Sequence, residues 1–312
     1  MNPDLPVLIA TSVVRGSQQG ESHGGVYLVD FGQRKVRQCI DWNNCNIDFS
    51  GRGWDRGLRG IAFRGDRIYI AASDRLLAYD RAFNLLGSWS NRYLRHCHEI
   101  AVKDAMLFLS STGFDSLLGF SLEREEFVWG ACLSRNAGGG FGATGFDPRG
   151  DAGPEPRNTL HLNSVSVEDA GIFVGGLRVP ALLRLGSRMQ VATVCSLPLG
   201  THNAQRFGEG VLFNDTPADT VRYVARAGGE RAFAIIGYEA GQIENAGLDD
   251  SNIARQRFGR GLCVVNEQLI AAGSSPSTIS LYDLPTGQRV AAVNLSMDIR
   301  NAIHGLEVWP FT

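Results

Sequence analysis

A short pattern recurs six times along the 312-residue chain and constrains its fold more than any other feature. The pattern is a polar residue, a small or polar residue, an apolar residue, any residue and a second apolar residue. In approximate form it is found as RGIAF from position 59, HEIAV from 98, NSVSV from 163, NAQRF from 203, RGLCV from 260 and HGLEV from 304. Neighbouring copies begin 39 to 65 residues apart. Repeated units of several tens of residues are typical of propellers and solenoids, in which each unit buries its apolar face against the next.

Most copies are followed by three more apolar or alternating segments that are separated by turns, so each unit predicts a four-stranded sheet. After the first copy, the segments are DRIYIAAS, DRLLAYD and NLLGSWS. The sixth copy has no such followers, while PVLIATSVV, GGVYLVD and KVRQCIDW precede the first copy. The sequence therefore predicts an all-β, six-bladed β-propeller whose C-terminal strand joins the N-terminal blade and so protects the sheet edges.

The predicted blades form one domain over residues 1–312. They span 304–312 together with 6–41, then 59–90, 98–133, 161–197, 203–237 and 260–295. Long connections are expected at 43–57, 136–158 and 238–257. The second is too rich in Gly and Pro for a strand, and the third has room for a short helix. All three should lie on the face where the inner strands begin, which is where functional loops gather.

Composition excludes several classes of partner. The formal net charge is -2 and no long Lys or Arg run is present, so we expect no nucleic-acid partner. The sequence start lacks a signal-peptide pattern and no window of 18 apolar residues occurs, so we expect no membrane span. Four of the six cysteines, at 39, 132, 195 and 263, lie in apolar strand-like segments, while Cys45 and Cys97 lie in more polar ones. Scattered cysteines of this kind indicate a reducing, cytoplasmic location.

The first residue of each repeat should line the central channel, and none of the six is apolar. They are Arg59, His98, Asn163, Asn203, Arg260 and His304. His96 and His161 lie two positions before their anchors and can point to the same side of the strand, and His202 can turn in from a loop. Such polar residues can hold an anion, a metal ion or a small molecule. The alternative is that each histidine caps a strand or binds neighbouring backbone.

Two chemistries fit these residues. In the first, a divalent Fe, Zn or Mn ion is held where His98, His161, His202 and His304 converge, with Asn163 or Asn203 nearby. Ca²⁺ is less favoured because it prefers oxygen ligands. In the second, no metal binds, and histidine acts as acid or base while Arg59 and Arg260 face the negative charge of the substrate. Asp215 in LFNDT is a further catalytic candidate, although an Asn-Asp step also forms ordinary turns.

The segments HLNSVSVEDAGIFVGG and HGLEV resemble blade starts of six-bladed propellers of the gluconolactonase, strictosidine-synthase and NHL-repeat kind. HCHEIAV, GTHNAQ and LFNDT are also similar to an uncharacterised group of bacterial propeller proteins. The resemblance implies a central, often metal-containing site in which Asn163 corresponds to a metal-binding asparagine of the gluconolactonase group, with Asn203 as a second. His98 and His304 replace the acidic ligands of that group, which disfavours Ca²⁺ and lactonase activity.

The polar channel residues favour an enzyme over a scaffold. We therefore predict a metal-dependent hydrolase, lyase or oxygenase that acts on a small polar or anionic molecule at the channel mouth. The alternative is a non-catalytic propeller that binds a small ligand or a protein, because a fold alone does not determine function.

Overall fold

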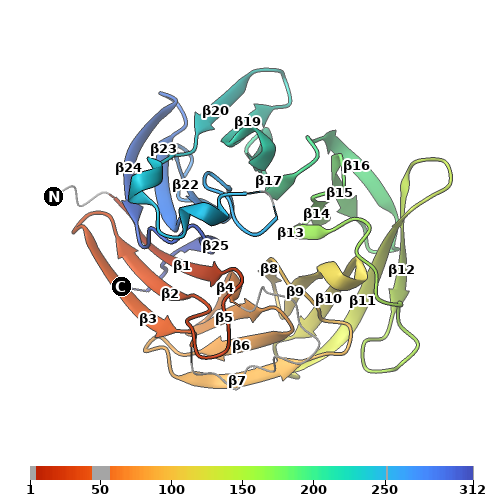
Figure 1. The fold of residues 1–312 in the computed structure, drawn as a ribbon. Helices are drawn as coiled ribbons and strands as arrows, with labels where there is room; N and C mark the ends of the chain where they lie inside the picture. The colour runs from red at the N-terminus through yellow and green to blue at the C-terminus, as the bar shows by residue number, and fades with distance from the viewer. Residues whose placement is uncertain (1–4, 44–56, 251, 312) are drawn as a thin grey trace. The chain divides into compact units, whose positions relative to one another are not determined.

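The computed structural model describes residues 5–43, 57–250 and 252–311, which form six antiparallel β-sheets (Figure 1). The sheets are the blades of a β-propeller, so the predicted all-β, six-bladed fold class is confirmed. Contacts divide the chain into two compact units. Unit 1 consists of residues 1–60 and 206–312, and unit 2 of residues 61–205.

Unit 1 contains the sheet in which the first and last strands pair. Its order is β25 (Asn301–Val308), β1 (Val7–Val14), β2 (Gly25–Asp30) and β3 (Lys35–Asp41), with β25 beside β1 in Figure 1. A second sheet holds β21 (Leu262–Val264), β22 (Leu269–Ser274), β23 (Thr278–Asp283) and β24 (Gln288–Asn294). In a third, β17 (Thr201–Phe207), which begins in unit 2, is followed by β18 (Gly210–Asp215), β19 (Thr220–Ala225) and β20 (Glu230–Ala234). The predicted pairing of the C-terminal strand with the N-terminal blade is therefore confirmed.

Unit 2 contains the other three sheets. One runs from β4 (Leu58–Arg64), which begins in unit 1, through β5 (Arg67–Ala72), β6 (Arg75–Tyr79) and β7 (Leu85–Ser90). The next holds β8 (Ile100–Lys103), β9 (Met106–Ser111), β10 (Ser116–Ser121), β11 (Glu126–Arg135) and β12 (Phe141–Phe146). The last holds β13 (Leu162–Glu168), β14 (Gly171–Gly176), β15 (Ala181–Leu185) and β16 (Val191–Ser196).

The core of each blade lies in its inner strands. In unit 1, β22 and β23 are almost wholly buried, whereas the last strand of that sheet, β24, is mostly exposed. Apolar residues of β1, β2, β21, β22, β23 and β25 form one continuous cluster in this unit. In unit 2, a comparable cluster joins Leu76 and Ala78 of β6 to Leu107 and Leu109 of β9. The outer strands therefore face solvent, and the inner strands carry the burial that stabilises the fold.

One expectation about the connections is wrong. Residues 136–158 were expected to be too rich in Gly and Pro for a strand, but β12 pairs with β11 along its whole length. The Phe146 ring covers Gly130 of β11 so closely that a Cβ at Gly130 would lie 2.4 Å from it, and Phe141 packs on a core cluster of the unit. Aromatic residues at both ends thus anchor a glycine-containing strand at the sheet edge.

The other two long connections have different outcomes. Residues 238–257 contain two single 3-10 turns, η3 (Ala240–Gln242) and η4 (Ala246–Leu248), in agreement with the expected short helix. The connection at 43–57, with Cys45, lies outside the described residues except for Asn43 and Gly57. No helix in the described part of the chain is long and apolar enough to cross a membrane.

Candidate functional site

In unit 2, two buried histidines bind the backbone two residues before them. The Nδ1 atom of His98 lies 2.7 Å from the carbonyl oxygen of His96, and that of His202 lies 3.1 Å from the carbonyl oxygen of Gly200. His96 and Gly200 both have a left-handed backbone, with φ of 54° and 86°. The left-handed turn brings the carbonyl group to the side chain that follows.

The same backbone turn precedes Asn163. His161, two residues earlier, also has φ of 54°. Asn163 and His202 are each the second residue of their strands, β13 and β17. His202 therefore lies in a strand rather than in the expected loop, and it occupies the place that corresponds to Asn163. Asn203, the expected anchor, is the next residue, with a left-handed backbone of its own (φ 52°).

These contacts fix where the imidazole protons lie. A carbonyl oxygen can only accept, so the Nδ1 atoms of His98 and His202 must carry hydrogen, and the lone pair of each neutral ring is on Nε2. The Nδ1 atom of His98 also lies 2.9 Å from Thr112 Oγ1, whose hydroxyl donates to the carbonyl oxygen of Leu162. The threonine therefore accepts from His98, which gives the same tautomer. The side chains of His98 and His202 are buried, with residue exposures of 6% and 2%.

His161 is held against His98 by a buried carboxylate. The two imidazole rings are 5.3 Å apart in an edge-to-face arrangement. Asp115, which is fully buried, accepts hydrogen bonds from Thr159 N and Oγ1 at 2.7 and 2.6 Å, from Leu160 N at 3.0 Å and from His161 N at 3.2 Å. Asp115 thereby fixes the segment that carries His161.

Two asparagine side chains and one glutamate complete the unit 2 cluster. Asn163 Nδ2 donates to the carbonyl oxygen of Thr201 at 2.9 Å. Asn203 Nδ2 donates to Glu99 Oε2 at 2.8 Å. Glu99 was not expected in the site because regular alternation after His98 turns it away. Strand β8 begins only at Ile100, however, and Ser110 Oγ accepts from the backbone N–H of both His98 and Glu99.

In unit 1, Arg260 and His304 are in direct contact. Arg260 Nη1 lies 2.5 Å from His304 Nε2, and the two residues are only 8% and 3% exposed. A guanidinium only donates, so His304 Nε2 accepts and the neutral ring carries its proton on Nδ1. The Arg260 guanidinium also lies 4.7 Å from the centre of the Phe258 ring, and that of Arg15 lies 4.6 Å from it. Phe258 was not recognised in the sequence, because its contact with Arg15 joins residues that are far apart in the sequence.

The backbone of Arg59 lies next to Gly305, the residue after His304, in the same unit. Arg59 is fully buried, and its carbonyl oxygen accepts from Thr11 Oγ1 at 2.6 Å. Thr11 Oγ1 in turn accepts from Gly305 N at 2.8 Å. A Cβ at Gly305 would lie 2.2 Å from the Arg59 carbonyl oxygen, so glycine is required where β25 passes β4. The backbone of Arg59 therefore lies beside Gly305, the residue that follows His304.

Asp215 has an ion-pair partner. Its Oδ2 atom lies 2.7 Å from Arg222 Nη1, and Asp215 is 4% exposed. Arg222 also donates to both carboxylate oxygens of Glu230, each at 2.8 Å. The neighbouring Asn214 Nδ2 lies 3.5 Å from the carbonyl oxygen of Gly261. Asp215 thus belongs to a charged network on β18, β19 and β20.

The predicted metal ligands do not form a set that fits a metal ion. Among the described residues, no three His, Cys, Asp or Glu side chains lie close enough together to hold one. In unit 2, His98 is grouped with His161, and in unit 1 the Nε2 atom of His304 accepts from Arg260.

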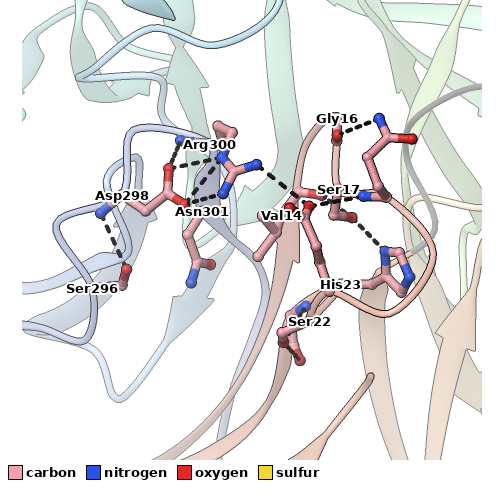
Figure 2. Close-up of polar contacts among 12 residues, drawn as sticks. Val14, Gly16, Ser17, Ser22, His23, Ser296, Asp298, Arg300 and Asn301 are labelled. Carbon is pink, nitrogen blue, oxygen red and sulfur yellow. Dashed lines mark hydrogen bonds and ion pairs between the residues drawn. The ribbon is translucent and has the colours of Figure 1, made fainter. Parts of the chain in front are cut away.

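The sixth histidine, His23, lies in a separate polar network of unit 1 (Figure 2). Its Nδ1 atom forms a short hydrogen bond with Ser17 Oγ, and the Ser17 hydroxyl donates to the carbonyl oxygen of Val14 at 2.9 Å. Because the serine proton goes to Val14, His23 donates to Ser17 and does not activate it as a nucleophile. Nearby, Arg300 donates to both carboxylate oxygens of Asp298.

No protein-family model matches the sequence, and a search of curated proteins finds no match. Among solved structures, a protein of unknown function from Bacteroides caccae has a TM-score of 0.61 at 9% identity and covers 98% of this chain and 100% of its own. A chain of a nidogen/laminin complex has a TM-score of 0.60 at 7% identity, with 97% and 98% covered. A streptogramin B lyase has a TM-score of 0.44 at 13% identity, with 74% and 70% covered. At these identities the likeness concerns the propeller fold alone.

Proposed function

We propose that the protein is an enzyme that acts on a small molecule carrying a carboxylate or phosphate group, and that Arg59 and Arg260 of unit 1 bind this anion. The observation that carries the proposal is the buried contact of Arg260 with His304 beside a fully buried Arg59. Guanidinium groups keep their charge at any physiological pH, and their planar N–H donors match the oxygen atoms of carboxylates and phosphates.

His304 acts in this proposal as a positioning residue. Its Nε2 atom accepts from one nitrogen of Arg260, which restricts the rotation of the guanidinium and directs its other N–H groups. Because the ring is neutral in this contact, it adds no charge that would repel the guanidinium. Phe258, which lies against the Arg260 guanidinium, restricts it further.

Separately from the anion site of unit 1, His98 of unit 2 has the features of an acid or base. A general base needs a lone pair at a defined atom, and the contacts of His98 Nδ1 with His96 O and Thr112 Oγ1 leave that lone pair on Nε2. The His96 and Thr112 oxygens would also stabilise the imidazolium that forms when Nε2 takes up a proton.

Calorimetric titration with inorganic phosphate and with oxalate, at constant ionic strength, tests the anion site. We expect Arg59→Gln and Arg260→Gln to weaken binding at least about tenfold, because each removes a charged hydrogen-bond donor. The matched control is Arg226→Gln, which removes the same charge from an exposed turn of unit 1. Equal affinities in all three variants would overturn the anion site.

Conversion of small carboxylates and phosphate esters, followed by mass spectrometry, tests the catalytic part. If His98 acts as an acid or base, His98→Gln should lower conversion by about 100-fold, the contribution typical of such a group. Tight anion binding without conversion of any compound by the parent protein would instead identify a non-catalytic ligand-binding propeller.

A further inference from the structure

The loop at 238–257 of unit 1 borders an open cavity of about 390 Å³. One lining residue comes from the turn between β18 and β19 and the others from the loop: Asp219, Asp249, Asp250, Arg255, Gln256 and Arg257. The volume is within the range of about 300–1,000 Å³ that is typical of ligand pockets. Since five of the six lining residues are charged and the sixth is polar, the cavity favours a small charged molecule over an apolar one.

Two of the charged residues neutralise each other. Asp219 Oδ1 accepts from Arg255 Nη1 at 2.7 Å. Arg255 also donates to the carbonyl oxygen of Gln256 at 3.2 Å and to that of Thr216. The Arg255 guanidinium is therefore held in the wall of the cavity, and its pair with Asp219 adds no net charge.

Asp249 and Asp250 keep their negative charges. Asp249 Oδ1 accepts from Gln256 N at 3.1 Å, and its Oδ2 accepts from Gln256 Nε2 at 3.2 Å. Asp250 Oδ1 accepts from the backbone N–H groups of Asn252 and Ile253 at 2.7 and 2.8 Å. All of these donors are uncharged, and neither carboxylate forms an ion pair within the described chain. The cavity thus has two uncompensated negative charges.

Arg257 supplies one uncompensated positive charge. Its backbone N–H donates to the carbonyl oxygen of Ser275 at 2.9 Å. Its side chain extends over Gly237, where a Cβ would lie 2.2 Å from Arg257 Nε. The guanidinium forms no hydrogen bond or ion pair with any residue that the structure describes, so its planar N–H donors can bind a carboxylate.

The carboxylates do not form a metal-binding group, because no three acidic, histidine or cysteine side chains of the described chain lie close enough together. A complementary ligand must therefore carry separated charges, two positive groups for Asp249 and Asp250 and one negative group for Arg257. A basic amino acid has this set of charges, since it has a carboxylate, an α-ammonium group and a cationic side chain.

We infer that this cavity of unit 1 binds a free basic amino acid such as lysine, with the carboxylate at Arg257 and the two cationic groups at Asp249 and Asp250. Binding is by charge and hydrogen bonds, and no covalent step is involved. None of the lining residues belongs to the proposed anion site at Arg59 and Arg260, so either proposal can fail without the other.

The test uses the full chain with ¹⁵N-labelled arginine and follows the Nε–H signals of Arg255 and Arg257 by NMR during titration. Each signal is assigned by its loss in the corresponding Arg→Gln variant. The probe is L-lysine, and the controls are L-norleucine, which lacks the side-chain ammonium group, and cadaverine, which lacks the carboxylate. We expect lysine to shift both signals saturably and each control to bind about three- to tenfold more weakly, because it lacks one charged contact.

Substitutions of the lining residues separate the two ends of the ligand. Arg257→Gln, followed at Arg255, should weaken lysine binding about three- to tenfold, while cadaverine should bind at least as tightly as it does to the parent, because a like charge is removed. Asp250→Asn keeps Oδ1 as an acceptor for the loop backbone and should weaken lysine and cadaverine alike. Asp283→Asn and Arg226→Gln remove the same charges from other turns of unit 1 and should bind as the parent does.

Three results would overturn the inference. The first is no saturable shift of either arginine signal with lysine in the parent protein. The second is equal affinity for lysine, norleucine and cadaverine, which would mean that the cavity recognises no defined set of charges. The third is equal lysine affinity in Arg257→Gln, Asp250→Asn and the two control variants, which would place the binding outside this cavity.

Discussion

The turn at Thr112–Asp115 of unit 2 and the turn at Thr216–Asp219 of unit 1 have the same backbone and hold different partners. Each is a single 3-10 turn between the second and third strands of its blade, closed by an aspartate with φ of 46° or 55°. In each, the threonine hydroxyl donates to a carbonyl oxygen before or at the start of the next inner strand, Leu162 in unit 2 and Gly259 in unit 1. The aspartates then differ.

Asp115 is fully buried and binds backbone N–H groups of residues 159–161, whereas the Asp219 side chain is 31% exposed and binds Arg255 Nη1 at 2.7 Å. Arg255 also donates to the carbonyl oxygen of Thr216 and lies 5.5 Å from the Phe258 ring. The Thr112–Asp115 turn therefore holds the backbone just before Asn163. The Thr216–Asp219 turn holds Arg255, which lies near the Phe258 ring. The two turns therefore share a backbone, while the side chains around them differ.

The largest effect on stability is expected when unit 1 loses its last strand, β25. Deleting residues 303–312 removes most of β25, with Ile303 and Leu306, which are 0% and 3% exposed. Each such loss costs about 2–5 kcal/mol, and β1 also loses its hydrogen-bonded neighbour, so the sum approaches the whole stability of a typical domain. We expect calorimetry to show no cooperative unfolding transition at the parent temperature.

Hydrogen exchange of the truncated protein measures which unit loses its amide protection first. Protection should disappear from β1 and β22 of unit 1 before it disappears from β9 and β10 of unit 2. A truncated protein that melts as the parent does would contradict the role of β25, and simultaneous loss everywhere would show that the two units unfold as one.

Asp115 and Asp219 should contribute differently to the free energy of unfolding, because Asp115 is more deeply buried. Asp115→Asn leaves backbone donors at Leu160 and His161 without their charged acceptor, so we expect the free energy of unfolding to fall by about 3–5 kcal/mol. Asp219→Asn weakens a partly exposed ion pair and should cost about 0–1 kcal/mol. Urea titrations measure both. Equal losses would show that the turns have the same role despite their different partners.

Sequence reasoning found the fold because strand alternation and turns are local signals that repeat six times. It missed β12 because glycine content was weighed above the two aromatic residues that anchor the strand. It named His98 and Arg260 from the recurring pattern, although each lies two residues before its strand, β8 or β21. It missed Glu99 because the backbone before β8 does not alternate regularly. Ser110 Oγ accepts hydrogen bonds from the backbone N–H groups of both His98 and Glu99.

The partners of the named residues were harder to predict. The contact of Arg260 with His304 joins residues 44 positions apart, and neither residue type indicates which atom of the other it binds. Likewise, the pairing of Asp115 with the segment before Asn163 depends on how two blades of unit 2 pack. Such contacts follow from tertiary structure, which a single sequence does not specify at the level of atoms.

A smaller effect concerns pH and belongs to unit 1. Burial raises the pKa of Glu307 in β25 from 4.5 to about 8. Between these values the unfolded chain has released the proton and the folded chain retains it, so the free energy of unfolding should fall as the pH rises from about 4.5 to about 8. Since Glu307 is partly exposed, we expect a loss of about 2–4 kcal/mol.

Glu307→Gln removes the titrating group and should abolish this pH dependence, with the largest stabilisation above pH 8. The same change should leave the thiol pKa of Cys263 raised by burial but no longer by the Glu307 charge. Glu230→Gln is the control, because its pKa is lowered by a hydrogen bond with Arg222 on the surface. Parallel stability curves for Glu307→Gln and the parent would contradict the prediction.

The smallest effect is expected in metal content, where sequence and structure give opposite expectations. The sequence predicts one Fe, Zn or Mn ion on His98, His161, His202 and His304, so His98→Ala and His304→Ala should lose it and His23→Ala should not. In the structure, His304 Nε2 instead accepts a hydrogen bond from the Arg260 guanidinium. Among the described residues, no three His, Cys, Asp or Glu side chains lie close enough together to hold a metal ion. Losing one of three or four ligands lowers metal affinity by orders of magnitude, so a real site would give a clear difference.

We therefore expect elemental analysis of protein purified without a histidine tag, after expression with added metal, to give the same low metal content in all three variants and the parent. His304→Gln sharpens the test, since a glutamine oxygen still accepts from Arg260 but cannot replace an imidazole ligand. If Arg260 is what His304 binds, His304→Gln should keep phosphate affinity close to that of the parent, while His304→Leu should weaken it by about three- to tenfold. Stoichiometric metal that disappears in His98→Ala and His304→Ala and persists in His23→Ala would reverse this assignment, because His304 Nε2 cannot accept from Arg260 and bind a metal ion with the same lone pair.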